Sequence, residues 1–87
     1  MMDSEDEKKR KQQEFFERAR KGVLKHLNDK GGTVTLGELH DYSLQTFFIQ
    51  HQGFSRMMEG FVDEGLVFYD EATQETLLTD KGKSFIA

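Results

Sequence analysis

The strongest constraint on the fold is the segment from Gly53 to Glu64, in which apolar residues recur with the period of an α-helix. They stand at positions i, i+3, i+4, i+7 and i+8: Phe54, Met57, Met58, Phe61 and Val62. This spacing places the five side chains on one stripe of a helix, which has to pack against a core. We therefore expect Met57 and Met58 in the core rather than in a flexible docking patch. Gly65 follows directly and predicts the end of the helix.

A long helix is predicted ahead of this segment, from about Asp6 to Asn28. Glu, Lys, Arg and Gln dominate this stretch and favour helix. An apolar stripe at helical spacing runs through it, formed by Phe16, Ala19, Val23, Leu24 and Leu27. Gly31 and Gly32 supply the stop signal. The acidic residues 1–6 are expected to be a disordered tail, and residues 7–87 a single domain.

The region between the two helices predicts a short strand followed by further helix. The β-branched run from Thr33 to Leu36 is typical of a brief strand. Residues 36–50 have a helical pattern, and both one helix and two fit, because Asp41 and Ser43 are each suitable as a new N-cap. The expected apolar row contains Leu36, Leu39, Tyr42 or Ser43, Leu44, Phe47 and Phe48. Residues 50–53 are the predicted turn.

The C-terminal third predicts a β-hairpin and a final helical turn. Residues 66–70 and 75–79 are typical of strands, and residues 71–74 form a plausible loop between them. Residues 79–86 are expected to form a short helical turn that docks Phe85 and Ile86 against the core.

Length and composition exclude several classes of protein. With 87 residues the chain can build one modest core, which leaves little material for an enzyme cleft. Glu38 and Asp41 share a helix face, but no nucleophile or phosphate-binding loop accompanies them, so we expect no enzyme. The absence of Cys excludes disulfides and thiolate metal sites and fits a reducing cytoplasm. No apolar run approaches the about 18 residues of a membrane span, and the acidic N-terminus is not a secretory signal.

The three histidines do not predict a metal site. His26, His40 and His51 are widely spaced and no Cys accompanies them, so zinc is not expected. We likewise expect no cofactor.

Charge is divided unevenly along the chain. Residues 8–30 contain nine basic and three acidic residues, a formal charge of +6, whereas residues 31–87 contain three basic and nine acidic residues, a formal charge of −6. A duplex-binding protein carries positive charge on the face that meets the phosphates. The acidic part therefore weighs against nucleic-acid binding. The run Lys8–Lys11 is either a phosphate-seeking arm or a frayed helix start compensated by the acids before it.

Three stretches resemble the winged helix-turn-helix family of DNA-binding domains. They are Gly32–Leu39, at a short strand entering a helix, Phe54–Val67, at a third helix and its exit, and Leu78–Ile86, at the exit from a wing. With the order of the predicted elements around them, the resemblance extends over about residues 10–86. The resemblance implies an α+β fold, namely a three-helix bundle with a β-hairpin wing and a long N-terminal helix. Within this family, the chain resembles small MarR-like or PadR-like regulators, or archaeal and phage winged-helix proteins.

The resemblance further implies a transcriptional regulator that binds double-stranded DNA. The helix around residues 53–64 would enter the major groove and the wing would follow the backbone. The candidate DNA-binding residues are Gln50, His51, Gln52, Ser55, Arg56, Lys81 and Lys83. Gln can contact adenine and Arg can contact guanine through paired hydrogen bonds. Arg56 also fits an ordinary solvated arginine, and residues 50–52 an ordinary polar turn, and these plainer interpretations are the commoner ones for such residues.

Phosphate contacts would have to come from scattered basic residues: Lys8–Lys11, Arg18, Lys21, Lys25, Lys81 and Lys83. The predicted hairpin tip instead carries Asp70, Glu71 and Glu75 with no basic residue, and such a tip repels a phosphate backbone. The alternative function is therefore a winged-helix module that binds a protein and not DNA.

A homodimer through the N-terminal helix is also predicted. Phe15 and Phe16 are adjacent and do not fit into one core stripe, so one of them is available to a second copy.

Overall fold

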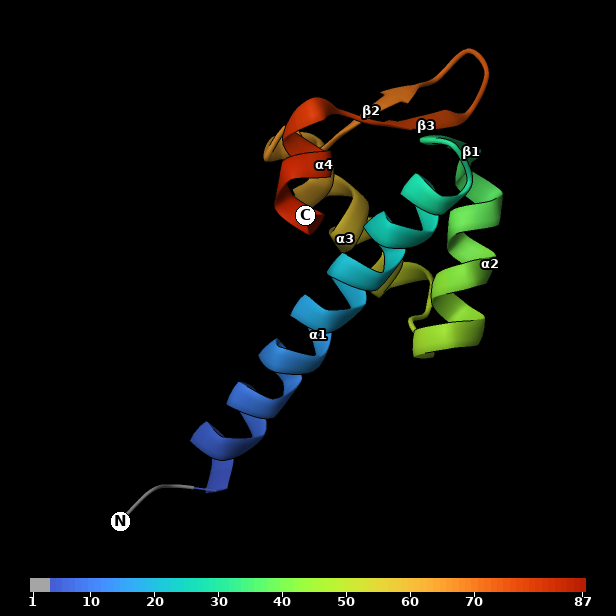
Figure 1. Ribbon diagram of the computed structural model, residues 1–87. Coiled ribbons are helices and arrows are strands. Elements are labelled where there is room, and N and C mark those ends of the chain that lie inside the picture. Colours follow the sequence, from blue (N-terminus) through green and yellow to red (C-terminus); the bar gives the residue numbers. More distant parts are fainter. Residues whose placement is uncertain (1–3) are drawn as a thin grey trace.

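The structure is a computed structural model that describes residues 4–87. Its elements follow the order α1 (Ser4–Asp29), β1 (Thr33–Thr35), α2 (Leu36–Phe47), α3 (His51–Asp63), β2 (Val67–Asp70), β3 (Glu75–Leu78) and α4 (Asp80–Ile86). In this described part, the chain has an α+β fold with four helices and one three-stranded antiparallel sheet (Figure 1).

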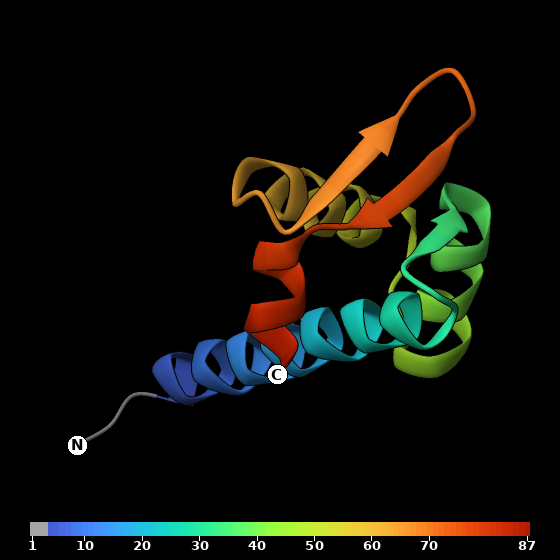
Figure 2. The ribbon, with the colours of Figure 1, turned by 45° about the horizontal axis from the view of Figure 1, so that its top comes forward.

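Helix α1 is much longer than the body against which it packs. Its N-terminal half extends away from the other elements in two views (Figures 1 and 2), and every side chain from Glu7 to Phe15 is exposed. The helix begins at Ser4, so residues 4–6 of the expected tail are helical. The rest of that predicted tail, residues 1–3, lies outside the described residues.

The C-terminal half of α1 supplies one wall of the core. Ala19, Val23, Leu24 and Leu27 are fully buried, and Phe16 packs partly buried against them, which confirms the predicted stripe. The helix ends as the two glycines predict: Gly32 has a φ of 88° and donates its N–H to the carbonyl oxygen of Leu27 at 2.9 Å.

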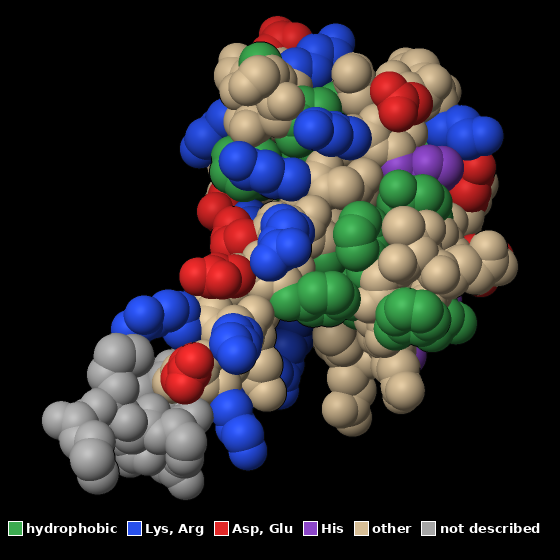
Figure 3. Space-filling view, turned by 60° about the horizontal axis from the view of Figure 1, so that its bottom comes forward, with side chains coloured by type: hydrophobic (Ala, Val, Ile, Leu, Met, Phe, Trp, Pro, Cys, Tyr) green, Lys and Arg blue, Asp and Glu red, His purple; other side chains and the backbone are tan. Residues whose placement is uncertain are grey.

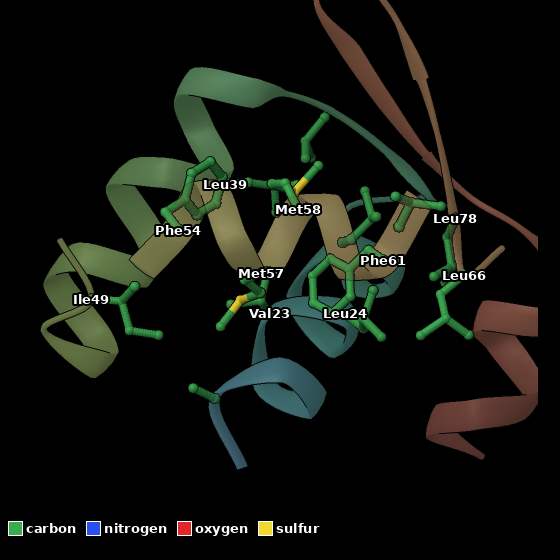
Figure 4. Close-up of a cluster of buried hydrophobic side chains, with 14 residues drawn as sticks. Val23, Leu24, Leu39, Ile49, Phe54, Met57, Met58, Phe61, Leu66 and Leu78 are labelled. Atoms are coloured by element: carbon green, nitrogen blue, oxygen red, sulfur yellow. The ribbon is translucent and has the colours of Figure 1, made fainter. Parts of the chain in front are cut away.

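Helix α3 crosses the centre of the core. Phe54, Met57, Met58 and Phe61 are buried among side chains from α1, α2 and the sheet, as their spacing predicts (Figure 4). The prediction was wrong for Val62, which is 47% exposed. Val62 lies at the edge of the apolar stripe, where none of the described elements covers it fully.

Residues 36–47 form one helix, α2, and not two. Thr35 is its N-cap, with the hydroxyl oxygen accepting the N–H of Glu38 at 3.2 Å. The helix ends at Phe48, which has a left-handed φ of 58°. The N–H of Ile49 then returns to the carbonyl oxygen of Ser43 at 3.2 Å, the pattern of a Schellman ending.

This ending overturns two predictions about the region. Ile49 turns into the core, whereas Phe48 is 81% exposed and Leu44 is 41% exposed, so the predicted apolar row fails at these two residues. The turn also comes earlier than predicted, because α3 already begins at His51 and not at Gly53. The cause is the left-handed residue, which reverses the chain direction within three residues.

The sheet has the strand order β1-β3-β2. Strands β2 and β3 form the predicted hairpin, and β1 pairs with the other edge of β3. Alternation places Val34, Thr76 and Leu78 toward the core, while Phe68 and Leu77 are a cross-strand pair on the outer face. The C-terminal end of helix α4 reaches the middle of α1 (Figure 2). There Phe85 and Ile86 pack against the core, as predicted.

Candidate functional site

The outward face of α3 carries most of the predicted contact residues. Gln50 is the extended N-cap residue of α3, and its side chain makes no capping hydrogen bond. His51, Gln52 and Arg56 are exposed, and Ser55 is half-buried. The structure therefore brings these five residues together within the first two turns of one helix, about 9 Å along its axis.

The two predicted lysines are not part of this cluster. Lys81 and Lys83 belong to α4, and the side chain of Lys81 passes close to Gly65, just beyond the C-terminal end of α3. The last residue of α3, Asp63, lies seven positions beyond Arg56, or about 10 Å along the helix. The seven predicted residues thus divide into a cluster of five and a remote pair.

A groove runs beside α3 and is formed by two adjoining hollows of about 560 and 410 Å³. Leu36, Met58 and Glu59 line both hollows. The larger hollow lies between α2 and α3 and reaches Gln74 of the hairpin loop, and the smaller one continues along α3 to Tyr69 of β2. We call this surface the α3 groove.

The α3 groove has an apolar floor and an acidic rim. Phe54 and Val62 extend the apolar surface that Leu36 and Met58 begin. Asp41, Glu59 and Asp63 are exposed acids along its edges, and no Lys or Arg is among the described residues that line it. The sequence alone did not reveal the groove, because its two walls come from separate helices and the hairpin.

Two histidines meet inside the groove. The rings of His40 and His51 are 5.6 Å apart between centroids, and His40 also meets Phe54 edge-on at 5.1 Å. His26 instead stacks on Tyr42 at 3.8 Å. Within the described residues, no three His, Asp or Glu side chains are placed to hold a metal ion. The pairing of His40 with His51 was not predicted, because it depends on how α2 crosses α3.

One ion pair fixes the C-terminal end of α3 to α1. The guanidinium of Arg20 is nearly buried and pairs with Glu64, and it also donates to Glu17 at 3.0 Å. The same group lies over the rings of Phe61 and Phe85 at 5.4 and 5.6 Å from their centroids. Arg20 is therefore a packing residue, although the sequence counts it with the basic charges of α1.

The run Lys8–Lys11 lies on the projecting half of α1, far from α3 in both ribbon views. All four side chains are exposed, and Lys11 makes a loose pair with Glu7 at 3.8 Å. Figure 3 shows Lys and Arg side chains along this helix, mixed with acids, and hydrophobic side chains gathered on the body beside it. The basic run and Arg56 therefore do not form one continuous positive face.

Comparison with known proteins gave no family match, no similar curated protein and no similar solved structure. Among residues 4–87, none of the helices combines the length and the apolar composition that crossing a membrane requires.

Proposed function

We propose that the chain is a winged-helix domain that binds double-stranded DNA through α3, as a small transcriptional regulator does. The order of helices and strands supports this proposal, with α2 and α3 as the helix-turn-helix and the hairpin of β2 and β3 as the wing. Inference from a fold to a function is analogy. The proposal therefore rests on the surface of α3 and not on the fold alone.

The observation that carries the proposal is the division of charge along α3. Its first two turns present His51, Gln52, Ser55 and Arg56, with no acid among them. Its acidic residues lie in the second half. Recognition helices contact base edges mainly with their N-terminal residues, so the half that would enter the major groove is free of charge repulsion.

The test is charge reversal at Arg56 with a matched control. Arg56→Glu is compared with Lys83→Glu in gel shifts on a duplex selected from a random pool. If Arg56 contacts a base, R56E weakens binding by about 1–3 kcal/mol and relaxes the preference at one base position. K83E makes the same charge change on α4 and is expected to leave the sequence preference intact. Equal binding by R56E and the parent chain removes Arg56 from this role.

A second candidate is a protein-binding module that does not bind DNA. The acidic rim of the α3 groove and the acids Asp70, Glu71 and Glu75 of the hairpin favour it, because both surfaces repel phosphates. Binding to random duplex separates the two candidates. A DNA-binding protein loses affinity steeply as salt rises. A complete lack of binding at low salt favours the protein-binding module.

A further inference from the structure

The α3 groove and the projecting half of α1 are complementary in charge and in apolar content. We propose that the projecting half of α1 from a second copy of this chain docks in the α3 groove. The inference does not depend on which of the two functions holds, but His51 and Ser55 also line the groove, so a docked helix and DNA would compete for this part of α3.

Residues 8–18 of α1, which are the projecting half and the turn that follows it, have one face suited to such a groove, and we call this segment the arm. Phe15 is 47% exposed and is not among the side chains that pack against the core. Lys8, Lys11 and Arg18 lie at positions −7, −4 and +3 from Phe15, so all four side chains fall within about 80° of one another around the helix. An exposed phenylalanine is thus surrounded by three exposed cations.

The groove offers the opposite arrangement. Its floor contains exposed apolar surface from Val62 and part of Leu36, which can receive an aromatic ring. Glu59 and Asp63 stand one helical turn apart on one wall, and Asp41 stands on the other. Lys11 and Phe15 are also one turn apart. When the ring lies on the floor, cations on both sides of it meet acids on both rims.

A second copy has to supply this helix, because α1 of the same copy is held elsewhere. Helix α1 is continuous from Ser4 to Asp29, and its C-terminal half is buried in the core. Its N-terminal half therefore cannot turn back toward α3 without breaking the helix. Charge also favours a second copy, since residues 8–30 carry +6 and residues 31–87 carry −6.

A contact between two α1 helices is less favourable than this arm-to-groove contact. An antiparallel pair centred on Phe15 would bring Lys11 of one copy beside Arg18 of the other on the face that carries the ring, and like charges repel. Arm-to-groove docking is instead heterologous, with each copy giving one arm and accepting another. We therefore expect association that increases with concentration and weakens with salt.

Sedimentation equilibrium of the full chain without DNA tests the proposal. The arm variant carries Lys11→Glu and Arg18→Glu, and the groove variant carries Glu59→Lys and Asp63→Lys; all four residues are exposed. Each variant alone is expected to remain monomeric at concentrations where the parent chain associates. A mixture of the two is expected to associate again, because the intact arm of one variant fits the intact groove of the other, and the reversed arm and the reversed groove are also complementary in charge.

A third variant controls for total charge. It carries Asp70→Lys and Glu71→Lys at the hairpin tip, the same charge change as the groove variant, and is expected to associate like the parent chain. Circular dichroism confirms that each variant is folded. A parent chain that stays monomeric at all concentrations overturns the proposal. So does a groove variant that associates normally while the arm variant does not, since that pattern indicates contact between two α1 helices.

Discussion

Gly82 of α4 lies so close to the carbonyl oxygen of Leu66 that a Cβ atom at position 82 would overlap it. Two backbones therefore touch where the chain leaves α3 and where it enters α4. Gly82 is also the glycine of the stretch Leu78–Ile86 that resembles the exit from a wing. The structure thus gives this residue of the motif a packing reason that is independent of any ligand.

Gly82→Ala is expected to destabilise the fold by about 3 kcal/mol, at the upper end of the cost of overpacking, because a backbone oxygen cannot move aside as a side chain can. Urea unfolding measures the change. Gly37→Ala is the control, because position 37 also lies in a helix but has open space around it. It should gain up to about 1 kcal/mol from helix propensity. Equal effects of the two substitutions would contradict the close contact.

The hydroxyl of Thr79 joins the same two segments. Its oxygen accepts the N–H of Gly82 at 3.0 Å as the N-cap of α4, and the hydroxyl donates to the carbonyl oxygen of Gly65 at 2.6 Å. Thr79→Val keeps the shape and removes both hydrogen bonds, so we expect a loss of about 1–2 kcal/mol in thermal or urea unfolding. Thr79→Ser retains the hydroxyl and should lose less than half as much. A valine variant as stable as the serine variant refutes the capping role.

The pair between Arg20 and Glu64 is expected to contribute modestly to stability. The Glu64 side chain is 50% exposed, so solvent screens the interaction, and we expect a coupling free energy of about 1 kcal/mol that falls at high salt. A double-mutant cycle with Arg20→Met and Glu64→Gln measures it. The exposed pair of Lys11 and Glu7 serves as the reference and should show a coupling close to zero. A coupling no larger than that of the reference pair would mean that Glu64 does not hold α3.

The two halves of α1 should differ sharply in amide hydrogen exchange. Amides of residues 8–14 are expected to exchange quickly, because this half has no core contacts and a short isolated helix is marginal in water. Amides near Val23 and Leu24 should be protected to the level of global unfolding. The measurement is made at low concentration, where association is absent. Equal protection in both halves would be inconsistent with a solvent-exposed N-terminal half.

The core of this fold could be predicted because it depends on local periodicity. The stripes of α1 and α3 and the strands of the hairpin follow from spacing and turn residues within single segments. The errors occur at residues whose burial or backbone conformation depends on contacts with other elements. Val62 lies beside the part of the stripe that other elements cover. Phe48 adopts a left-handed conformation at the end of α2, a position where glycine is the usual residue. Without that signal, the direction of the chain after α2 was not predictable.

The candidate site was predictable only within α3. His51, Gln52 and Arg56 share one helix, so their common exposure follows from the helical period. The α3 groove, the contact of His40 with His51, and the pairing of Arg20 with Glu64 each join separate elements. Arg20 and Glu64 are 44 positions apart, and only the packing angle of α1 against α3 brings them together. Gly22 is similar: the sequence shows only a poor helix former, whereas the structure places the ring of Phe47 against it.

Because the exposed half of α1 contributes almost nothing to the core, its length can change without disturbing the packing of the folded body. Adding or deleting seven residues ahead of Phe15 would shift the preceding residues by about 10 Å along the axis and nearly preserve their orientation around it. Adding two residues would instead rotate them by about 200° at almost unchanged reach. The chain can thus evolve the range and the direction of this extension separately, at no cost to the folded body.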